Sequence, residues 1–417
     1  MEHYKLIGPI TQLITMADLP LQGTLVGKEA QTIKQAGILI KGSNIYEVGI
    51  YEALLPKGEK LNAENITLDT EYVCLPGFID AHTHICFAGS RATDYAMRNA
   101  GKSYLEIAEN GGGIWDTVTN TRKASFEELQ YSIIKRANSL VRNGITTIEV
   151  KSGYGLSVTE ELKMLRAIRN ANQITEADLI ATCLAAHMLP NDYKGTKASY
   201  LHEIATTLFP ILQTENLTNR IDAFIEQSAF SATDIQPYFK QAKAMGFDIT
   251  VHADQFSTSG SEVAITFNAI SADHLEASTD YEIERLAASN VIAVALPGAS
   301  IGLGCNFAPA RKILDAGGAL AIASDWNPGS APMGDLLTQA CILGTFEKLT
   351  NIEVLAGITF RAAAALNLKD RGQLLPGMLA DFNLFPTDHY NEICYHQGKI
   401  LPSQVWKKGE LVYAEHS

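Results

Sequence analysis

Residues 75–84 have the sequence LPGFIDAHTH, which combines a Pro-Gly turn, a short apolar run and two histidines separated by one residue. After this segment, short apolar runs alternate with stretches of a dozen or more residues that carry apolar side chains at helical spacing. Alternation of this kind is typical of parallel βα units. The segment therefore marks the first strand of a parallel sheet.

Eight apolar segments have the length and composition of strands in this sheet. We predict them at residues 78–82, 146–150, 179–185, 223–226, 248–252, 269–273, 291–296 and 319–323. The stretches between them, for example 126–143 and 159–172, have the apolar spacing of helices. Eight such units in succession predict a (β/α)8 TIM-like barrel.

The two ends of the chain have a different pattern. Residues 37–49 form a strand, a Gly-Ser-Asn turn and a second strand, and residues 380–385 and 405–413 are again typical of strands. One small domain built from both termini accounts for all of them. We therefore predict an α/β fold in which residues 76–365 form the barrel, while residues 1–75 and 366–417 together form a small β-sandwich domain.

Length, charge and composition argue against a single-core domain, a nucleic-acid-binding protein and a membrane-spanning protein. The 417 residues exceed the roughly 250–300 at which a single core stops growing. Lys and Arg number 33 against 46 Asp and Glu, and this net charge of −13 argues against nucleic acid as a partner. Apolar runs such as 291–296 are too short to cross a bilayer, and the N-terminus lacks the pattern of a secretion signal. We expect a cytoplasmic protein that does not span a membrane.

The cysteines do not suggest a disulfide framework. None of the six belongs to a Cys-x-x-Cys pair, and most lie in apolar segments. We predict reduced and mostly buried thiols rather than disulfides or a zinc ribbon.

Histidines gather at the predicted strand ends, where barrel enzymes place their active sites. Five of the ten histidines fall there, namely His82, His84, His187, His252 and His274. His82 and His84 are two residues apart on an extended segment, so their side chains project from the same face. Two such histidines alone are weak evidence for a metal, but the convergence of five favours a metal centre.

Three imidazoles, from His82, His84 and His252, suit a single divalent ion together with the carboxylate of Asp325, and zinc and iron both fit these ligands. Such an ion lowers the pKa of a bound water toward about 7. We expect His274 to orient that water and transfer a proton, although it could also be a histidine that only supports the ligands or packs in the core. Asp325 could accept a proton as well as, or instead of, binding the metal.

Taken together, these residues resemble the amidohydrolase superfamily. The resemblance rests on residues 75–84, on His252, His274 and Asp325, and on the closing segment LPGMLADF at 375–382. It covers nearly the whole chain and implies a metal-dependent barrel hydrolase with a small β domain. Five further segments are similar to the imidazolonepropionase family: HTHICFAGSR at 82–91, NGGGI at 110–114, EVKSGYG at 149–155, SADHLE at 271–276 and SDWNPG at 324–329.

The family resemblance implies a small-molecule substrate, 4-imidazolone-5-propanoate, whose cyclic amide is hydrolysed to N-formimidoyl-L-glutamate. It also suggests a homodimer. The implied substrate contacts are Arg91, Tyr154, His187, Gln255, Asn327, Gly329 and Ser330. Arg91 could bind the propanoate tail with its guanidinium fork, although arginine at such a position is also common in surface salt bridges. His187 could donate to the ring carbonyl or to the tail, and residues 327–329 could equally form only a turn.

Two residues depart from the family pattern. Gln255 stands where some members have glutamate, and an amide can form a hydrogen bond but cannot act as a base, so that role would fall to His274 or Asp325. Ser330 stands where we expect threonine, which retains the hydroxyl. The Gly111–Gly113 run has no Lys-Ser/Thr after it, so we interpret it as a loop near the site rather than a phosphate-binding motif.

Three other functions remain open. A deaminase of the nucleobase type would use nearly the same metal ligands. A two-metal cyclic amidohydrolase would need a bridging carboxylated lysine, whereas the predicted fourth strand ends at Glu226. An inactive barrel that serves as a binding protein is disfavoured by the intact set of histidines with Asp325.

Overall fold

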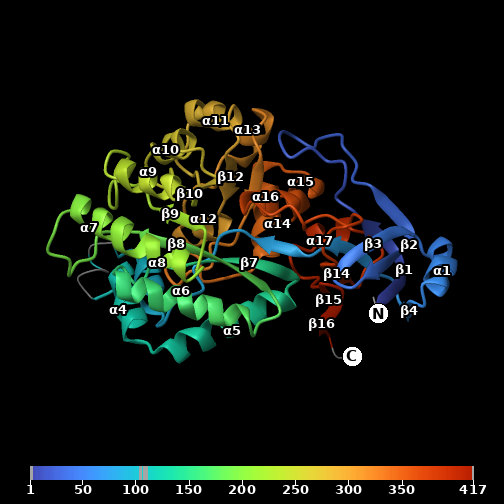
Figure 1. Ribbon diagram of the computed structural model, residues 1–417. Coiled ribbons are helices and arrows are strands. Elements are labelled where there is room, and N and C mark those ends of the chain that lie inside the picture. The colour runs from blue at the N-terminus through green and yellow to red at the C-terminus, as the bar shows by residue number, and fades with distance from the viewer. Residues whose placement is uncertain (1–2, 103–105, 107–110, 416–417) are drawn as a thin grey trace.

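The parallel strands expected from the sequence form a barrel in the computed structural model, which describes residues 3–102, 106 and 111–415 (Figure 1). Neighbours in this sheet follow the chain order, and the paired strands are parallel. The strands are β6 (Phe78–Asp80), β7 (Ile145–Lys151), β8 (Asp178–Ala186), β9 (Arg220–Ala223), β10 (Asp248–Ala253), β11 (Ser271–His274), β12 (Ile292–Ala295) and β13 (Leu320–Ile322). The predicted barrel is thereby confirmed.

The first and last strands meet just beyond their carboxyl ends. Thr83 and Trp326 form an isolated parallel bridge, and the Asp325 amide donates to the His82 carbonyl at 3.0 Å. This contact draws the segment after β6 against the segment after β13. The two segments carry predicted metal ligands, so barrel closure itself brings those ligands together.

The fourth strand was predicted about three residues too late. The regular strand ends at Ala223, and beyond it only isolated bridges continue: Phe224 to His252 of β10, and Ile225 to Phe230. Glu226 then accepts hydrogen bonds from the amides of Phe256 and Ser257, each at 3.0 Å. This carboxylate fixes the loop after β10 rather than ending a strand.

Helices surround the barrel (Figure 1). Their bounds are α2 (Ala92–Asn99), α4 (Ile114–Lys123), α5 (Phe126–Arg142), α6 (Val158–Asn172), α7 (Lys197–Glu203), the π-helical η1 (Ile204–Leu208), α8 (Phe209–Thr214), α9 (Gln236–Ala244), α10 (Gly260–Thr266), α11 (Asp280–Ala287), α12 (Pro297–Leu303), α13 (Ala310–Asp315), α14 (Leu336–Glu347), α15 (Asn351–Gly357) and α16 (Phe360–Ala365). Helix α5 shows why such segments fold. Ser125 and Glu128 form a capping box at its start, and its apolar stripe, including Leu129 and Ile133, is fully buried.

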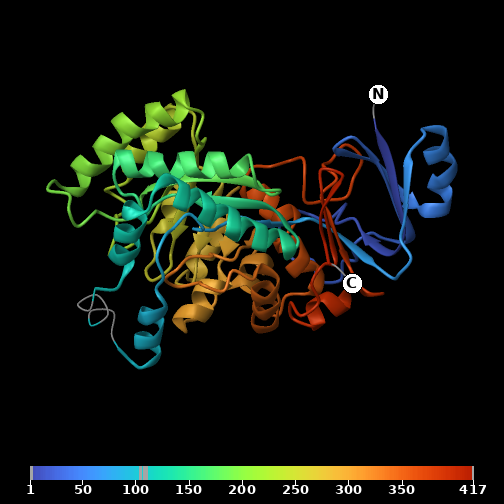
Figure 2. The same cartoon turned by 90° about the horizontal axis from the view of Figure 1, so that it is seen from below.

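A second sheet combines strands from both termini, and Figure 2 shows the N-terminal and C-terminal segments side by side in it. Its elements are β1 (Tyr4–Ile14), β2 (Thr32–Lys41), β3 (Asn44–Ile50), α1 (Tyr51–Lys60), β4 (Glu64–Thr67), β5 (Val73–Pro76), β14 (Phe382–Phe385), α17 (Asn391–Tyr395), β15 (Gln404–Lys407) and β16 (Glu410–Ala414). Antiparallel pairing of β5 with β14 joins the two ends of the chain. The expected origin of this β unit from both termini is confirmed, while the limits 1–75, 366–417 and 76–365 remain our proposal.

Two further expectations concern the chain as a whole. All six cysteines are free, and each is buried except Cys305. Within the part of the chain that the structure describes, no helix has the length and apolar character needed to cross a membrane.

Candidate metal and substrate site

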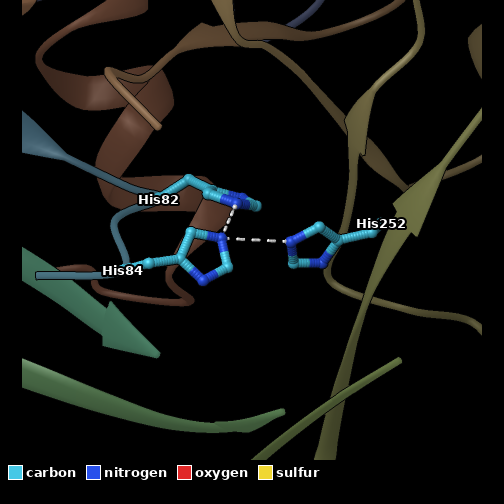
Figure 3. Close-up of side chains that lie close together, drawn as sticks. All are labelled: His82, His84 and His252. Atoms are coloured by element: carbon cyan, nitrogen blue, oxygen red, sulfur yellow. Dashed lines mark hydrogen bonds between the residues drawn. The ribbon is translucent and has the colours of Figure 1, made fainter. Parts of the chain in front are cut away.

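Three histidines converge at the carboxyl end of the barrel (Figure 3). His82 and His84 follow β6, and His252 lies on β10. The Nε2 atom of His84 lies 3.2 Å from that of His82 and 3.3 Å from that of His252. All three side chains are buried, and one nitrogen from each lies within 4.8 Å of the others. The three imidazoles therefore surround one point that a metal ion can share.

Two carboxylates orient two of these histidines through Nδ1, the ring nitrogen that does not face the shared point. His82 Nδ1 donates to Asp273 Oδ2 at 2.7 Å, and His252 Nδ1 lies 3.0 Å from Asp222 Oδ2. A proton held on Nδ1 leaves the lone pair of Nε2 directed at the shared point. Burial lowers the pKa of His82 and His84 well below the usual value, and that of His252 to about 3. Neutral, oriented imidazoles fit a divalent metal.

Asp325 lies beside the same nitrogens. Its Oδ1 is 3.4 Å from His84 Nε2 and 3.6 Å from His82 Nε2. Burial raises the pKa of Asp325 to about 6. The residue follows β13 and has φ 53°, in the left-handed region that residues other than glycine seldom adopt. Asp325 therefore lies next to two of the three histidines, and its role as a fourth ligand remains a proposal.

His274 ends β11 next to this centre. Its φ is 91° and that of Leu275 is 75°, both costly for residues with a side chain, and such strain clusters at functional sites. His274 Nδ1 lies 3.4 Å from Glu276 Oε1. Burial lowers the pKa of His274, but the carboxylates of Glu276 and Asp325 outweigh it, so the pKa is raised. Glu276 was missed by the sequence reasoning, although it follows the histidine by only two positions.

A cavity of about 610 Å³ opens above the histidines, and all seven predicted substrate contacts line it. These are Arg91, Tyr154, His187, Gln255, Asn327, Gly329 and Ser330. His84, His252, His274 and Asp325 also line it, whereas His82 is fully buried and does not line it. The fold thus brings the predicted metal and substrate residues into one space.

Arg91 is held at the edge of this cavity. Its Nε donates to the Asp94 carboxylate, and its Nη1 lies 3.5 Å from Thr117 Oγ1. Asp94 also accepts from the Gly113 amide at 2.9 Å. The end of the predicted Gly111–Gly113 loop is therefore near the site, while Asn110, the first residue of that motif, lies outside the described residues.

His187 differs from the expectation that it donates to the substrate. Its Nδ1 donates to the Gly153 carbonyl at 2.9 Å, because a carbonyl can only accept. Burial lowers its pKa to about 4, so the ring is neutral and its Nε2 is an acceptor. Only an N–H or O–H of a ligand can therefore pair with it.

Residues 327–330 form a tight turn as well as a cavity wall. Asn327 Oδ1 accepts from the amides of Gly329 and Ser330 at 2.7 and 2.8 Å. Ser330 Oγ lies 3.4 Å from Asp325 Oδ2. Both interpretations of this segment, turn and ligand contact, are compatible with its position.

Sequence reasoning noted Asp273 at a strand end but assigned no role to it or to the other charged residues that lie close to the histidines. Lys151, Asp222 and Asp273 are buried within the barrel, and Glu149 accompanies them. A charged pair, Glu149 and Lys151, in the otherwise uncharged segment 145–151 was the available signal, since buried charges need partners.

Comparisons with known proteins agree with this geometry. A family model described as the amidohydrolase family matches residues 107–413. The imidazolonepropionase of Acinetobacter baumannii strain ACICU is 39% identical over 392 residues, which cover 93% of this chain and 97% of that protein. The imidazolonepropionase of Pseudomonas aeruginosa strain UCBPP-PA14 is 40% identical over 393 residues, covering 94% and 97%.

Solved structures share the architecture. A triazine hydrolase from Arthrobacter aurescens has a TM-score of 0.75 at 17% identity and covers 99% of this chain and 95% of its own. The ochratoxinase of A. niger has a TM-score of 0.70 at 16% identity and covers 99% and 96%. At these identities the likeness shows the fold alone.

Proposed function

The chain belongs to the amidohydrolase family, and on this premise we propose that it has imidazolonepropionase activity, the hydrolysis of 4-imidazolone-5-propanoate to N-formimidoyl-L-glutamate in histidine degradation. The observation that carries the proposal is the shared cavity, in which Arg91 faces the same space as the histidine centre. Identity of 39–40% to imidazolonepropionases over almost the full length supports the same activity.

His82, His84, His252 and Asp325 would hold one divalent metal, zinc or iron. When bound there, the metal would polarise the scissile carbonyl and make water a stronger nucleophile at neutral pH. The donor set fits such an ion because the imidazoles are neutral and two of them are oriented by carboxylates.

The cavity residues account for substrate binding. The Arg91 guanidinium pairs with the propanoate tail, and this pairing selects a substrate that carries a free carboxylate. Tyr154 and Gln255 contact the heterocycle, and His187 Nε2 accepts from a ring N–H. Asn327, Gly329 and Ser330 close the wall beside Asp325.

Asp325 and His274 carry the proton transfers. Asp325 takes a proton from the attacking water, whose oxygen adds to the ring carbonyl carbon. His274, held by Glu276, delivers a proton to the ring nitrogen as the C–N bond breaks. The former carbonyl becomes the α-carboxylate of the product.

Hydrolysis of freshly generated imidazolonepropionate by the purified protein tests the activity. Loss of its ultraviolet absorbance, with mass identification of formimidoylglutamate and abolition by a chelator, is the expected result. Ammonia release from neutral amino-heterocycles, without turnover of imidazolonepropionate by metal-replete protein, would favour a deaminase and refute the proposal.

We further propose a homodimer in the cytoplasm that does not bind nucleic acid. The family resemblance supports the dimer, and the net charge of −13 opposes association with phosphate backbones. Light scattering coupled to gel filtration tests the assembly, and a mass of one chain would exclude the dimer.

A further inference from the structure

Lys151 contacts the buried carboxylates that lie against the histidines. It is the last residue of β7, and its side chain is fully buried. Its Nζ donates to Glu149 Oε1 at 2.7 Å and lies 2.8 Å from Asp222 Oδ2 and 3.8 Å from Asp273 Oδ2. One ammonium group therefore faces three buried carboxylates.

Two of these carboxylates are the ones that orient metal-site histidines. Asp273 accepts from His82 Nδ1, and Asp222 lies against His252 Nδ1. The same Oδ2 atom of each aspartate faces both the histidine and Lys151. A continuous chain of contacts thus runs from Lys151 through the two aspartates to two of the three imidazoles, His82 and His252.

The attraction between the Lys151 ammonium and the aspartate carboxylates strengthens this chain of contacts. Lys151 Nζ and Asp222 Oδ2 lie within ion-pair distance, so opposite charges attract there, whereas the neutral His252 ring meets Asp222 only through its polar Nδ1–H. Because these groups are almost completely buried, the attraction is little screened by water. Thr250 Oγ1 also donates to Asp273 Oδ2 at 3.4 Å, but of Thr250 and Lys151 only the lysine ammonium contacts both Asp222 and Asp273.

We propose that Lys151 is a positioning residue for the metal site, which orients His82 and His252 by holding Asp273 and Asp222 in place. The inference rests on the metal site of the proposed function, but it concerns metal binding rather than turnover. The same contacts leave Lys151 no free amine to bridge two metals, because its ammonium is engaged by carboxylates.

Metal affinity is the decisive measurement. Full-length protein is stripped of metal and titrated with Zn²⁺ against a chromophoric chelator, and with Co²⁺ to record its visible absorption bands. Lys151→Met should raise the metal dissociation constant by about 10–100-fold, the range typical for the loss of groups that orient ligands, and should alter the Co²⁺ bands. Lys151→Gln, which retains a polar side chain without the charge, should behave in the same direction.

Lys407 provides a matched control. It is also a buried lysine between two carboxylates, with Nζ 2.6 Å from Asp381 Oδ2 and 2.8 Å from Asp178 Oδ2, but it lies in the β domain. Lys407→Met should lower the melting temperature and leave metal affinity and the Co²⁺ bands unchanged. This pair separates loss of a buried ion pair from loss of ligand orientation.

A coupling test completes the experiment. In protein that carries Asp222→Asn with Asp273→Asn, adding Lys151→Met should change the dissociation constant by less than threefold, because the aspartates transmit its effect. The proposal is overturned if Lys151→Met and Lys151→Gln both bind Zn²⁺ within threefold of the unmodified protein. Since no substrate is used, this outcome is independent of whether the proposed hydrolysis is observed.

Discussion

Replacing Arg91 by methionine tests how the cavity selects its substrate. The Arg91 side chain is 11% exposed, Asp94 holds its Nε, and Nη1 makes a long contact with Thr117 Oγ1 at 3.5 Å. Nη2 and the second N–H of Nη1 can still pair with a carboxylate. Two charge-assisted hydrogen bonds contribute roughly 1.5–2 kcal/mol each, together about 3–4 kcal/mol. Since about 1.4 kcal/mol corresponds to a factor of ten, Arg91→Met should lower kcat/KM by about 10²–10³-fold.

The assay follows ultraviolet loss of imidazolonepropionate at several concentrations. Arg91→Lys, which retains the charge but loses the planar fork, should recover part of the loss. The matched control is Arg166→Met, which removes an arginine paired with Glu215 outside the cavity lining and should leave kcat/KM unchanged. Melting temperature and metal content verify that the Arg91 variants are folded and loaded.

A substrate analogue with a neutral propanamide tail isolates the carboxylate. If Arg91 binds the tail, the difference between the unmodified protein and Arg91→Met should shrink to less than about tenfold on the amide, because the charge that the arginine recognises is absent. Activity of Arg91→Met within threefold of the unmodified enzyme on imidazolonepropionate would refute the assignment.

Three further predictions concern other contacts. Removing metal with a chelator should abolish hydrolysis and lower the melting temperature, and Zn²⁺ or Fe²⁺ should restore both, as measured by assay and calorimetry. Gln255→Leu should lower kcat/KM by about tenfold, which corresponds to the loss of about one neutral hydrogen bond. The pH profile of kcat should stay unchanged, because an amide is not a base, and a shifted profile would contradict the proposed role of Gln255. Glu353 accepts from the Leu25 amide and from Arg311, and these contacts outweigh burial and lower its pKa from 4.5 to about 2. Its stabilising contribution is therefore complete above about pH 5 and is lost as the pH falls toward 2. Glu353→Gln should lower the free energy of unfolding by about 2–3 kcal/mol at pH 7 and by less at pH 4. Urea unfolding at the two pH values measures this difference.

The local pattern of apolar residues along the sequence was enough to predict the barrel architecture. Parallel barrel strands are buried on both sides, so they appear in the sequence as short apolar runs between amphipathic segments. For the same reason a polar residue at the end of such a run is conspicuous. The sequence pattern thus predicted His82, His84, His252 and Asp325 as metal ligands, and the structure brings the three histidines together. The error in the fourth strand arose where the chain remains apolar beyond the regular strand, at Phe224 and Ile225, which form only isolated bridges.

Only the tertiary structure showed which groups orient the site residues. Lys151, Asp222 and Asp273 lie on different strands, and their contacts depend on how the strands close around the barrel axis. The acceptor role of His187 depends on a carbonyl 34 positions away in the chain, that of Gly153. Sequence determines which elements form and which side chains face their ends, because burial and periodicity are local properties. Distances between groups far apart in the chain are set by packing. These distances decide which ring nitrogen of each histidine carries the proton and which charged group orients the ring.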